Sequence, residues 1–261
     1  MSKPLFKLAD ISPHHPLTRA IQQILHPPAK LPIKTRKVIL ALPMISMTLM
    51  APLVQATGVG VFEESSDNLN PLAGINVGQY SSPTFVDIDS DGDFDFFIGK
   101  HNGAISYFEN QGSVNSPSFV EQVATNPAVN IEVDSRSNSI FADTDNDGDL
   151  DIFIGQFDGT ISYFENTGTS QSPSFVERTG ANNPLDGIGI EIYSVPTFED
   201  IDDDNDLDVF IGANSGIIYY FENTGSPSNP VFVERTGANN PLDGIDVGNN
   251  SSPIFVDIDQ E

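Results

Sequence analysis

A run of alternating aspartates occurs three times in this chain and begins a fourth time near residue 257. The complete copies span Asp87–Asp95, Asp143–Asp151 and Asp200–Asp208, so their starting points are almost evenly spaced along the chain. Carboxylates at alternate positions around a tight turn are the oxygen ligands that a hard cation such as calcium requires. A nearly constant period of this length also indicates one supersecondary unit repeated several times.

Each residue of the first copy has a defined place in such a cation site. Alternate aspartates lie on one side of the turn, and a glycine at the sixth position allows the backbone to bend sharply. The predicted donors are the carboxylates of Asp87, Asp89, Asp91 and Asp95 and the main-chain carbonyl of Asp93, with Gly92 at the turn.

The run resembles the front half of an EF-hand loop, but its continuation differs. An EF-hand needs a bidentate glutamate at the twelfth position and helices on both sides. Here the twelfth position is Ile98, Ile154 or Ile211, and the flanking segments have the composition of strands. The loop is therefore predicted to belong to a β scaffold.

The whole unit repeats, and not only the loop. An Asn-Pro pair opens successive copies, which predicts units at 70–125, 126–182 and 183–239 and a partial unit at 240–261. Each complete unit contains four short runs of strand-forming residues, and a residue followed by glycine forms the turn between the second and third runs. The predicted strands are 83–86, 94–99, 105–108 and 118–121; 139–142, 150–155, 161–164 and 174–177; and 196–199, 207–212, 218–221 and 231–234.

The second and third strands of each unit are apolar at both alternating positions, so both faces of each sheet must be covered. Four-stranded sheets packed face to face around an axis satisfy this requirement, and this is the β-propeller arrangement. A parallel β-helix would have a shorter period, and a sandwich would not need such similar units. We therefore predict an all-β propeller of four-stranded blades, with three full repeats. Lone strands at 61–64 and 253–256 suggest a truncated or incomplete ring.

Loop, strands and spacing together resemble the FG-GAP/VCBS-type repeats, which are similar to the blades of integrin α-subunits. The resemblance covers residues 58–261 and rests on runs such as Phe85–Gly99 followed by Gly103–Asn110. It implies a β-propeller, usually seven-bladed, with calcium held between the first and second strands of a blade. It extends the ligand set to the other two loops: Asp143, Asp145, Asp147, Asp149 (carbonyl) and Asp151, and Asp200, Asp202, Asp204, Asp206 (carbonyl) and Asp208.

The third and fourth loops depart from the pattern. Asn205 stands where the first two loops have glycine, and asparagine tolerates a left-handed backbone less well, which predicts a weaker third site. Asp257 and Asp259 lack the rest of their loop, so only three sites are predicted.

The charge is unevenly distributed along the chain. The net charge is −26, seven of the eleven basic residues lie at or before Lys37, and 16 of the 37 acids lie in the three loops. The part of the chain after residue 56 is therefore strongly acidic, and it is expected to repel nucleic acid and anionic lipid. The absence of cysteine excludes disulfides and thiolate metal sites.

Residues 1–56 have the order of segments found in a secretory signal with a long basic region. Lys34–Lys37 is basic, 38–54 is a predominantly apolar run that contains two prolines, and Val54–Ala56 has small residues suited to cleavage. The run is short for a bilayer-spanning helix, although an uncleaved anchor remains the alternative. Either reading predicts export to the cell surface or the medium, where calcium is plentiful, and no membrane span remains after cleavage.

Two functions are compatible with these features. The first is non-catalytic binding of a protein or glycan, as in adhesion propellers. The alternative is a carbohydrate-active enzyme, lyase-like or hydrolase-like, on the same scaffold. An enzyme needs a cluster that breaks the repeat, whereas the units are nearly interchangeable, and His101 is the only histidine after residue 56. No catalytic or organic-cofactor residue is predicted, and open blade edges favour self-association.

Overall fold

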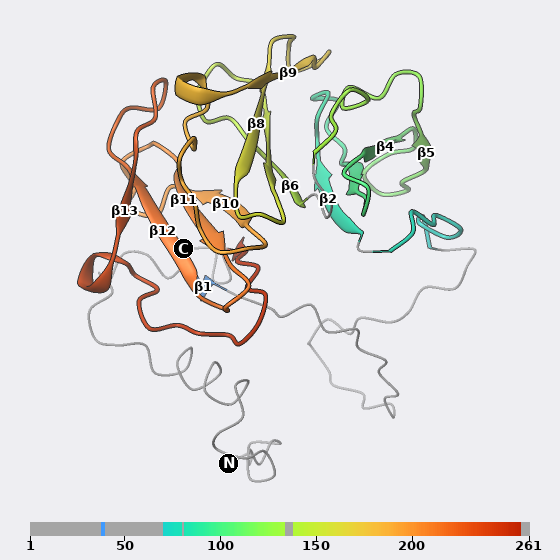
Figure 1. The fold of residues 1–261 in the computed structure, drawn as a ribbon. Coiled ribbons are helices and arrows are strands. Elements are labelled where there is room, and N and C mark those ends of the chain that lie inside the picture. The colour runs from blue at the N-terminus through green and yellow to red at the C-terminus, as the bar shows by residue number, and fades with distance from the viewer. Residues whose placement is uncertain (1–37, 40–69, 80, 134–137, 257–261) are drawn as a thin grey trace, which may run out of the picture.

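The computed structural model describes residues 38–39, 70–79, 81–133 and 138–256. These residues form three four-stranded antiparallel sheets and one two-stranded sheet (Figure 1). Two 3-10 turns, η2 (Gly180–Asn182) and η3 (Gly237–Asn239), are the only named helical elements in the described part of the chain. None of the described helices has the length and hydropathy of a membrane span.

Each large sheet is built from strands that follow one another in the sequence, and each strand pairs with the next. The first sheet contains β2 (Ser82–Val86), β3 (Asp95–Gly99), β4 (Ile105–Asn110) and β5 (Phe119–Glu121). The second contains β6 (Asn138–Ala142), β7 (Asp151–Gly155), β8 (Ile161–Asn166) and β9 (Phe175–Arg178). The third contains β10 (Val195–Glu199), β11 (Asp208–Gly212), β12 (Ile218–Asn223) and β13 (Phe232–Arg235), and β1 (Val38–Ile39) pairs with β14 (Phe255–Val256).

The three sheets confirm the predicted four-stranded repeats and the order of their strands. The register also repeats, because Phe97 faces Tyr107, Phe153 faces Tyr163 and Phe210 faces Tyr220 across equivalent strand pairs. The last predicted strand, 253–256, is shorter than expected and is reduced to β14. The predicted strand at 61–64, the predicted cleavage site and the fourth loop at 257–259 lie outside the described residues.

The hairpin turns between second and third strands depend on glycine. Gly103, Gly159 and Gly216 have φ values of 84°, 90° and 89°, which a side chain disfavours. At Gly159 a Cβ atom would also lie 2.3 Å from the carbonyl oxygen of Glu191. The connection that leads into the next sheet therefore passes directly against the preceding hairpin.

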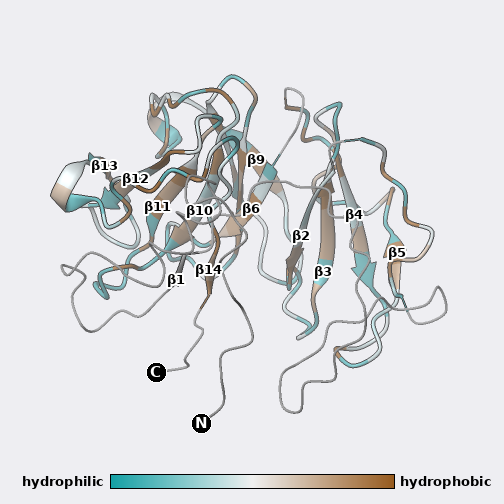
Figure 2. Cartoon of the chain, turned by 90° about the horizontal axis from the view of Figure 1, so that it is seen from below, coloured by the Kyte–Doolittle hydropathy of each residue, from teal (hydrophilic) through white to brown (hydrophobic). Residues whose placement is uncertain are grey.

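The core lies between neighbouring sheets, because each second strand buries alternate residues on opposite faces. Phe153 and its neighbour Tyr163 pack toward the third sheet, whereas Ile152 and Ile154 pack toward the first. The strands accordingly carry hydrophobic residues along their length (Figure 2). The prediction that both faces of each blade are covered is confirmed for the second sheet.

One aromatic contact recurs at each junction. The ring centroids lie 4.8 Å apart for Phe97 and Phe141, 4.6 Å for Phe153 and Phe198, and 4.7 Å for Phe210 and Phe255. In each pair the first phenylalanine comes from a second strand and the other from the first strand of the following unit. The same packing step is thus applied three times, as in the blades of a propeller.

The outward face of the first sheet is covered differently. Phe96, Ile98 and Phe108 form a cluster with Leu72, Ile75 and Val77, which precede β2. Phe85 and Phe94 remain 49% and 64% exposed at this face. Leu150, the equivalent of Phe94 in the second unit, packs against the core between the first two sheets.

We expect the exposed rings of Phe85 and Phe94 to drive self-association, because exposed hydrophobic patches are typical association sites. Phe94→Ser should reduce the apparent mass measured by light scattering and change the free energy of unfolding by no more than about 0.5 kcal/mol. Leu150→Ser is the matched control at the equivalent, packed position, and it should destabilise the fold by about 1–3 kcal/mol. An unchanged mass distribution for the Phe94 variant would contradict the role of this face.

Candidate metal centres

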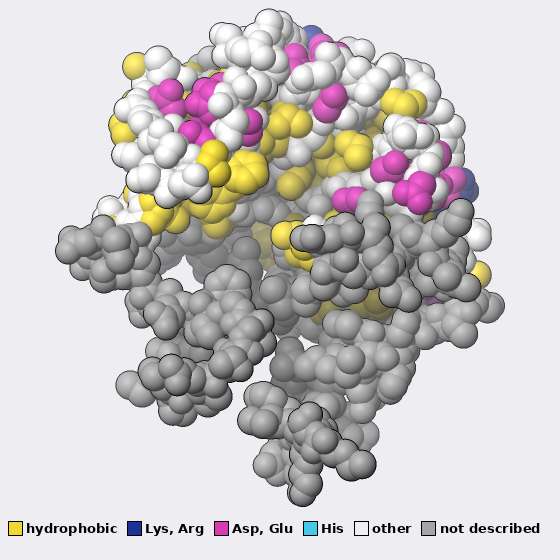
Figure 3. Space-filling view, turned by 180° about the vertical axis from the view of Figure 1, so that it is seen from behind, with side chains coloured by type: hydrophobic (Ala, Val, Ile, Leu, Met, Phe, Trp, Pro, Cys, Tyr) yellow, Lys and Arg dark blue, Asp and Glu magenta, His cyan; other side chains and the backbone are white. Residues whose placement is uncertain are grey.

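The three aspartate loops connect the first and second strands of each large sheet. In each loop the first, third and fifth aspartates place one carboxylate oxygen apiece within 4.8 Å of the others. Acidic side chains gather in groups on the molecular face seen in Figure 3. The structure therefore brings together the predicted triplets Asp87, Asp89 and Asp91; Asp143, Asp145 and Asp147; and Asp200, Asp202 and Asp204.

Backbone N–H groups hold each triplet in the same geometry. In the second loop, Asp147 N and Gly148 N donate to the two oxygens of Asp143 at 3.2 and 3.1 Å, and Asp149 N donates to Asp147 Oδ1 at 3.1 Å. The first and third loops repeat these three bonds at 3.0–3.2 Å. The carboxylates are thus oriented by the loop's own backbone.

The sixth residue of each loop has a left-handed backbone conformation. Gly92, Gly148 and Asn205 have φ values of 95°, 94° and 72°. Asn205 also donates its N–H to Asp200 Oδ2 at 3.1 Å, as the glycines do to their own first aspartates. The substitution therefore preserves the loop geometry, and the predicted weakening of the third site stays a prediction about affinity.

Several buried carboxylate oxygens in these loops have no hydrogen-bond partner among the described residues. They are Oδ1 of Asp145 at the third position and Oδ1 of Asp93, Asp149 and Asp206 at the seventh position. Asp206 is only 7% exposed. Buried carboxylate oxygens normally have a partner, and clustered hard oxygen donors suit calcium, so these residues fit a calcium ion. The sequence assigned the seventh residue only a carbonyl role, whereas the structure also directs its carboxylate to the buried side of the loop.

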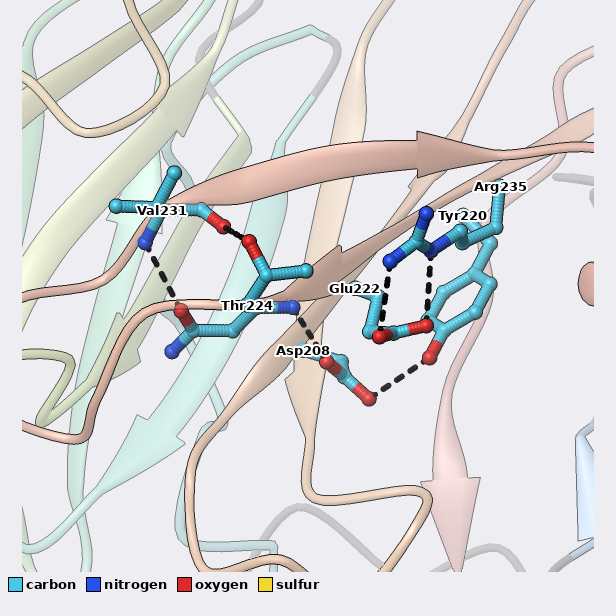
Figure 4. Close-up of polar contacts among 7 residues, drawn as sticks. Asp208, Tyr220, Glu222, Thr224, Val231 and Arg235 are labelled. Carbon is cyan, nitrogen blue, oxygen red and sulfur yellow. Dashed lines mark hydrogen bonds and ion pairs between the residues drawn. The ribbon is translucent and has the colours of Figure 1, made fainter.

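The ninth-position aspartates are buried at the start of the second strands and are bound to their own sheets. Asp208 Oδ2 accepts a bond from the Tyr220 hydroxyl at 3.0 Å, and Asp208 Oδ1 accepts one from Asn223 N at 2.7 Å (Figure 4). The same two bonds, at 2.8–2.9 Å, join Asp95 to Tyr107 and Asn110, and Asp151 to Tyr163 and Asn166. A carboxylate has about four acceptor positions, so two hydrogen bonds still leave room for the predicted cation contact.

The tyrosines in this network have a second role that the sequence did not reveal. Their rings stack on the second-strand phenylalanines with centroids 4.6–4.7 Å apart, so they pack within the blades. Their hydroxyl groups additionally bind the ninth aspartate. The signal was present as a tyrosine and an asparagine that follow this aspartate at the same separations in all three units, as in Asp95, Tyr107 and Asn110.

The asparagine side chains extend the network to the next turn. Asn166 Oδ1 accepts bonds from Gly168 N at 3.0 Å and Ser174 N at 2.9 Å, and the equivalent asparagines do the same in the other units. One chain of hydrogen bonds therefore links each aspartate loop to the third strand and to the turn before the fourth.

Burial raises the pKa of the ninth aspartates, against the lowering effect of their hydrogen bonds. The pKa rises from 3.8 to about 7 for Asp151 and Asp208 and to about 6 for Asp95. In the loop itself, burial and the charges of neighbouring aspartates raise the pKa of Asp89 and Asp145. Without a cation, these carboxyl groups therefore bind protons more readily than a free aspartate does.

The tyrosine hydroxyl should contribute to stability. Tyr163→Phe leaves a buried oxygen of Asp151 without its partner, which should lower the free energy of unfolding by about 1–3 kcal/mol in chemical denaturation. Tyr219→Phe is the control, because that hydroxyl lies 3.5 Å from the exposed Glu191 and its loss should cost less than about 0.5 kcal/mol. Equal effects of the two variants would show that the buried bond contributes nothing specific.

The stability of the metal-depleted protein should depend on pH. Because the folded-state pKa of Asp151 is about 7 against 3.8 for the free side chain, the folded state holds more protons between these values. The free energy of unfolding should therefore fall as pH rises from about 4 to 7. Asp151→Asn mimics the protonated carboxyl and should reduce the slope in thermal denaturation, because Asp95 and Asp208 still titrate. Calcium should reverse the slope, because it favours the charged carboxylates. Stability that rises with pH in the metal-depleted protein would contradict this assignment.

Comparison with known protein families finds a repeat that coincides with the repeated loops and strands of the structure. The FG-GAP-like repeat matches the chain twice, over residues 87–154 and 143–211. Each match begins at the first aspartate of one loop and ends in the second strand of the following sheet, at Ile154 in β7 or Ile211 in β11. No curated protein matches the chain significantly. Two copies of the FG-GAP-like repeat therefore span Asp87 to Ile211, from the loop after β2 to the second strand of the third sheet.

Proposed function

We propose that this chain is an exported, calcium-binding repeat protein that binds a protein or glycan partner and catalyses no reaction. The observation that carries the proposal is the equivalence of the three aspartate triplets, each in the same loop of a repeated sheet. A rigid stack of sheets that holds ordered loops is suited to recognition. Export rests on the basic, apolar and small-residue segments before Thr57.

Calcium would supply positive charge to loops that otherwise repel themselves. The first, third and fifth aspartates would hold the ion, and the seventh residue would contribute from the side facing the sheet. The ninth aspartate would connect the ion to the tyrosine and asparagine of the third strand. The ion would thereby couple the loop between the first two strands to the rest of its sheet.

The absence of catalysis is supported by the repeat itself. A catalytic centre is usually unique in its chain, whereas the buried titratable groups of the described sheets recur in each unit as the same aspartate and tyrosine. These groups already have structural partners in the hydrogen-bond network.

The test is calcium dependence of both stability and binding. Titration calorimetry should find three calcium sites, and Asp145→Asn should leave two. Each filled site should add about 2.7 kcal/mol of stability at a hundredfold excess of calcium over its Kd. Asp243→Asn, an exposed change outside the loops, is the control and should leave three.

Binding is tested on protein and glycan arrays with calcium and with a chelator. Bound partners should be retained with calcium, released by the chelator and recovered unmodified. Equal melting temperatures in calcium and chelator would reject the metal assignment. Product formation on any retained polysaccharide would reject the non-catalytic assignment.

A further inference from the structure

A polar cleft of about 400 Å³ opens between the second sheet, its aspartate loop and the third sheet. Its lining comes from four segments that are distant in the sequence. Thr144 and Asp145 belong to the second loop, Glu165 and Arg178 belong to β8 and β9, Asn182 ends η2, and Asn229 lies in the turn before β13. The volume lies in the range typical of small-molecule sites.

Thr144 carries a buried hydroxyl group that has no hydrogen-bond partner in the described part of the chain. The residue is 4% exposed. The equivalent residues are Ile88 and Ile201, and both pack against apolar cores. Burying an unpaired hydroxyl where isoleucine packs well is destabilising, so a bound ligand or its hydration water is the expected partner.

Arg178 also differs from its equivalents. Its Nε donates to Glu165 Oε2 at 2.6 Å, and its terminal nitrogens make no hydrogen bond with the described residues. In the third unit, Arg235 uses two nitrogens on Glu222, at 2.9 and 3.0 Å (Figure 4). The first unit has Gln122 at this position, bound to Glu109. Among the three described units, the second thus combines a buried threonine hydroxyl with an arginine that has unused donors.

The cleft presents donors and acceptors side by side. Arg178 and the amides of Asn182 and Asn229 can donate, the carboxylates of Glu165 and Asp145 can accept, and the Thr144 hydroxyl can do both. Sugar hydroxyls donate and accept at the same oxygen, so such a mixed lining suits them. The positive charge of Arg178 is already paired with Glu165, so the cleft has no uncompensated positive charge for an anionic ligand.

We propose that this cleft binds one neutral saccharide unit through Thr144, Arg178, Glu165 and the two asparagine amides. The inference deepens the proposed function, because it names the ligand class and the place where a glycan partner would be recognised. Asp145 is left out of the tests, because it is also a candidate calcium ligand.

The experiment uses the full chain at saturating calcium. The probes are the methyl glycosides of glucose, galactose, mannose and N-acetylglucosamine, and binding is followed by saturation-transfer NMR and titration. Thr144→Val removes only the hydroxyl at a position where the other units have isoleucine. Arg178→Gln introduces the residue of the first unit. Arg235→Gln is the matched control, because it breaks the equivalent ion pair outside the cleft.

At least one probe should bind the wild type. Thr144→Val and Arg178→Gln should each weaken that binding by about fivefold, the effect of losing one hydrogen bond, whereas Arg235→Gln should not. Thr144→Val should melt no lower than the wild type, which separates lost binding from lost folding. Failure of every probe, or equal affinities for the wild type and both cleft variants, would overturn the proposal.

The number of calcium sites and the array results test the proposed function independently of the cleft. A partner that is retained on the arrays by the Thr144 and Arg178 variants as well as by the wild type would reject the cleft and leave the proposed function intact. Probe binding that is lost in these variants, together with three calcium sites, would support both.

Discussion

The bonds between the ninth aspartate of each loop, a tyrosine hydroxyl and an asparagine N–H hold the aspartate loop to its sheet. Through them, a charged and exposed turn is fixed to the buried centre of a blade. The same carboxylate is shared between the fold and the candidate metal centre. Folding without a cation therefore buries a carboxyl group that favours a proton, and folding with a divalent cation would bury a cluster whose negative charge is partly compensated.

Because the ninth aspartate serves both the fold and the candidate metal centre, the residues around it are nearly the same in all three units. The tyrosine must reach the aspartate, and its ring must also stack on the second-strand phenylalanine, which in turn meets the next unit. A change at any of these positions would disturb a loop, a sheet and a junction together. Positions outside the network vary more freely, as Gln122 and Arg178 show at equivalent places.

Much of the fold was predictable because its signals are local and periodic. Apolar runs at fixed intervals located the strands, and glycine after a polar residue located the hairpins at Gly159 and Gly216. The aspartate triplets were predictable for the same reason. The hydroxyl of Tyr163 was not, because a tyrosine in an apolar strand is explained by packing alone. The buried position of Thr144 could not be foreseen either, because it depends on contacts between sheets that carry no sequence period.

The connections between units return to the hairpins they have just left. Tyr193 N and Ser194 N donate to the carbonyls of Phe157 and Gln156, and Glu132 bridges to Ala104 in the unit before. Each sheet is therefore completed by the opening segment of the following repeat, so that neighbouring blades overlap along the chain. Fraying of one blade would then loosen the hairpin edge of its predecessor, and unfolding would spread backward along the array by nearest-neighbour coupling.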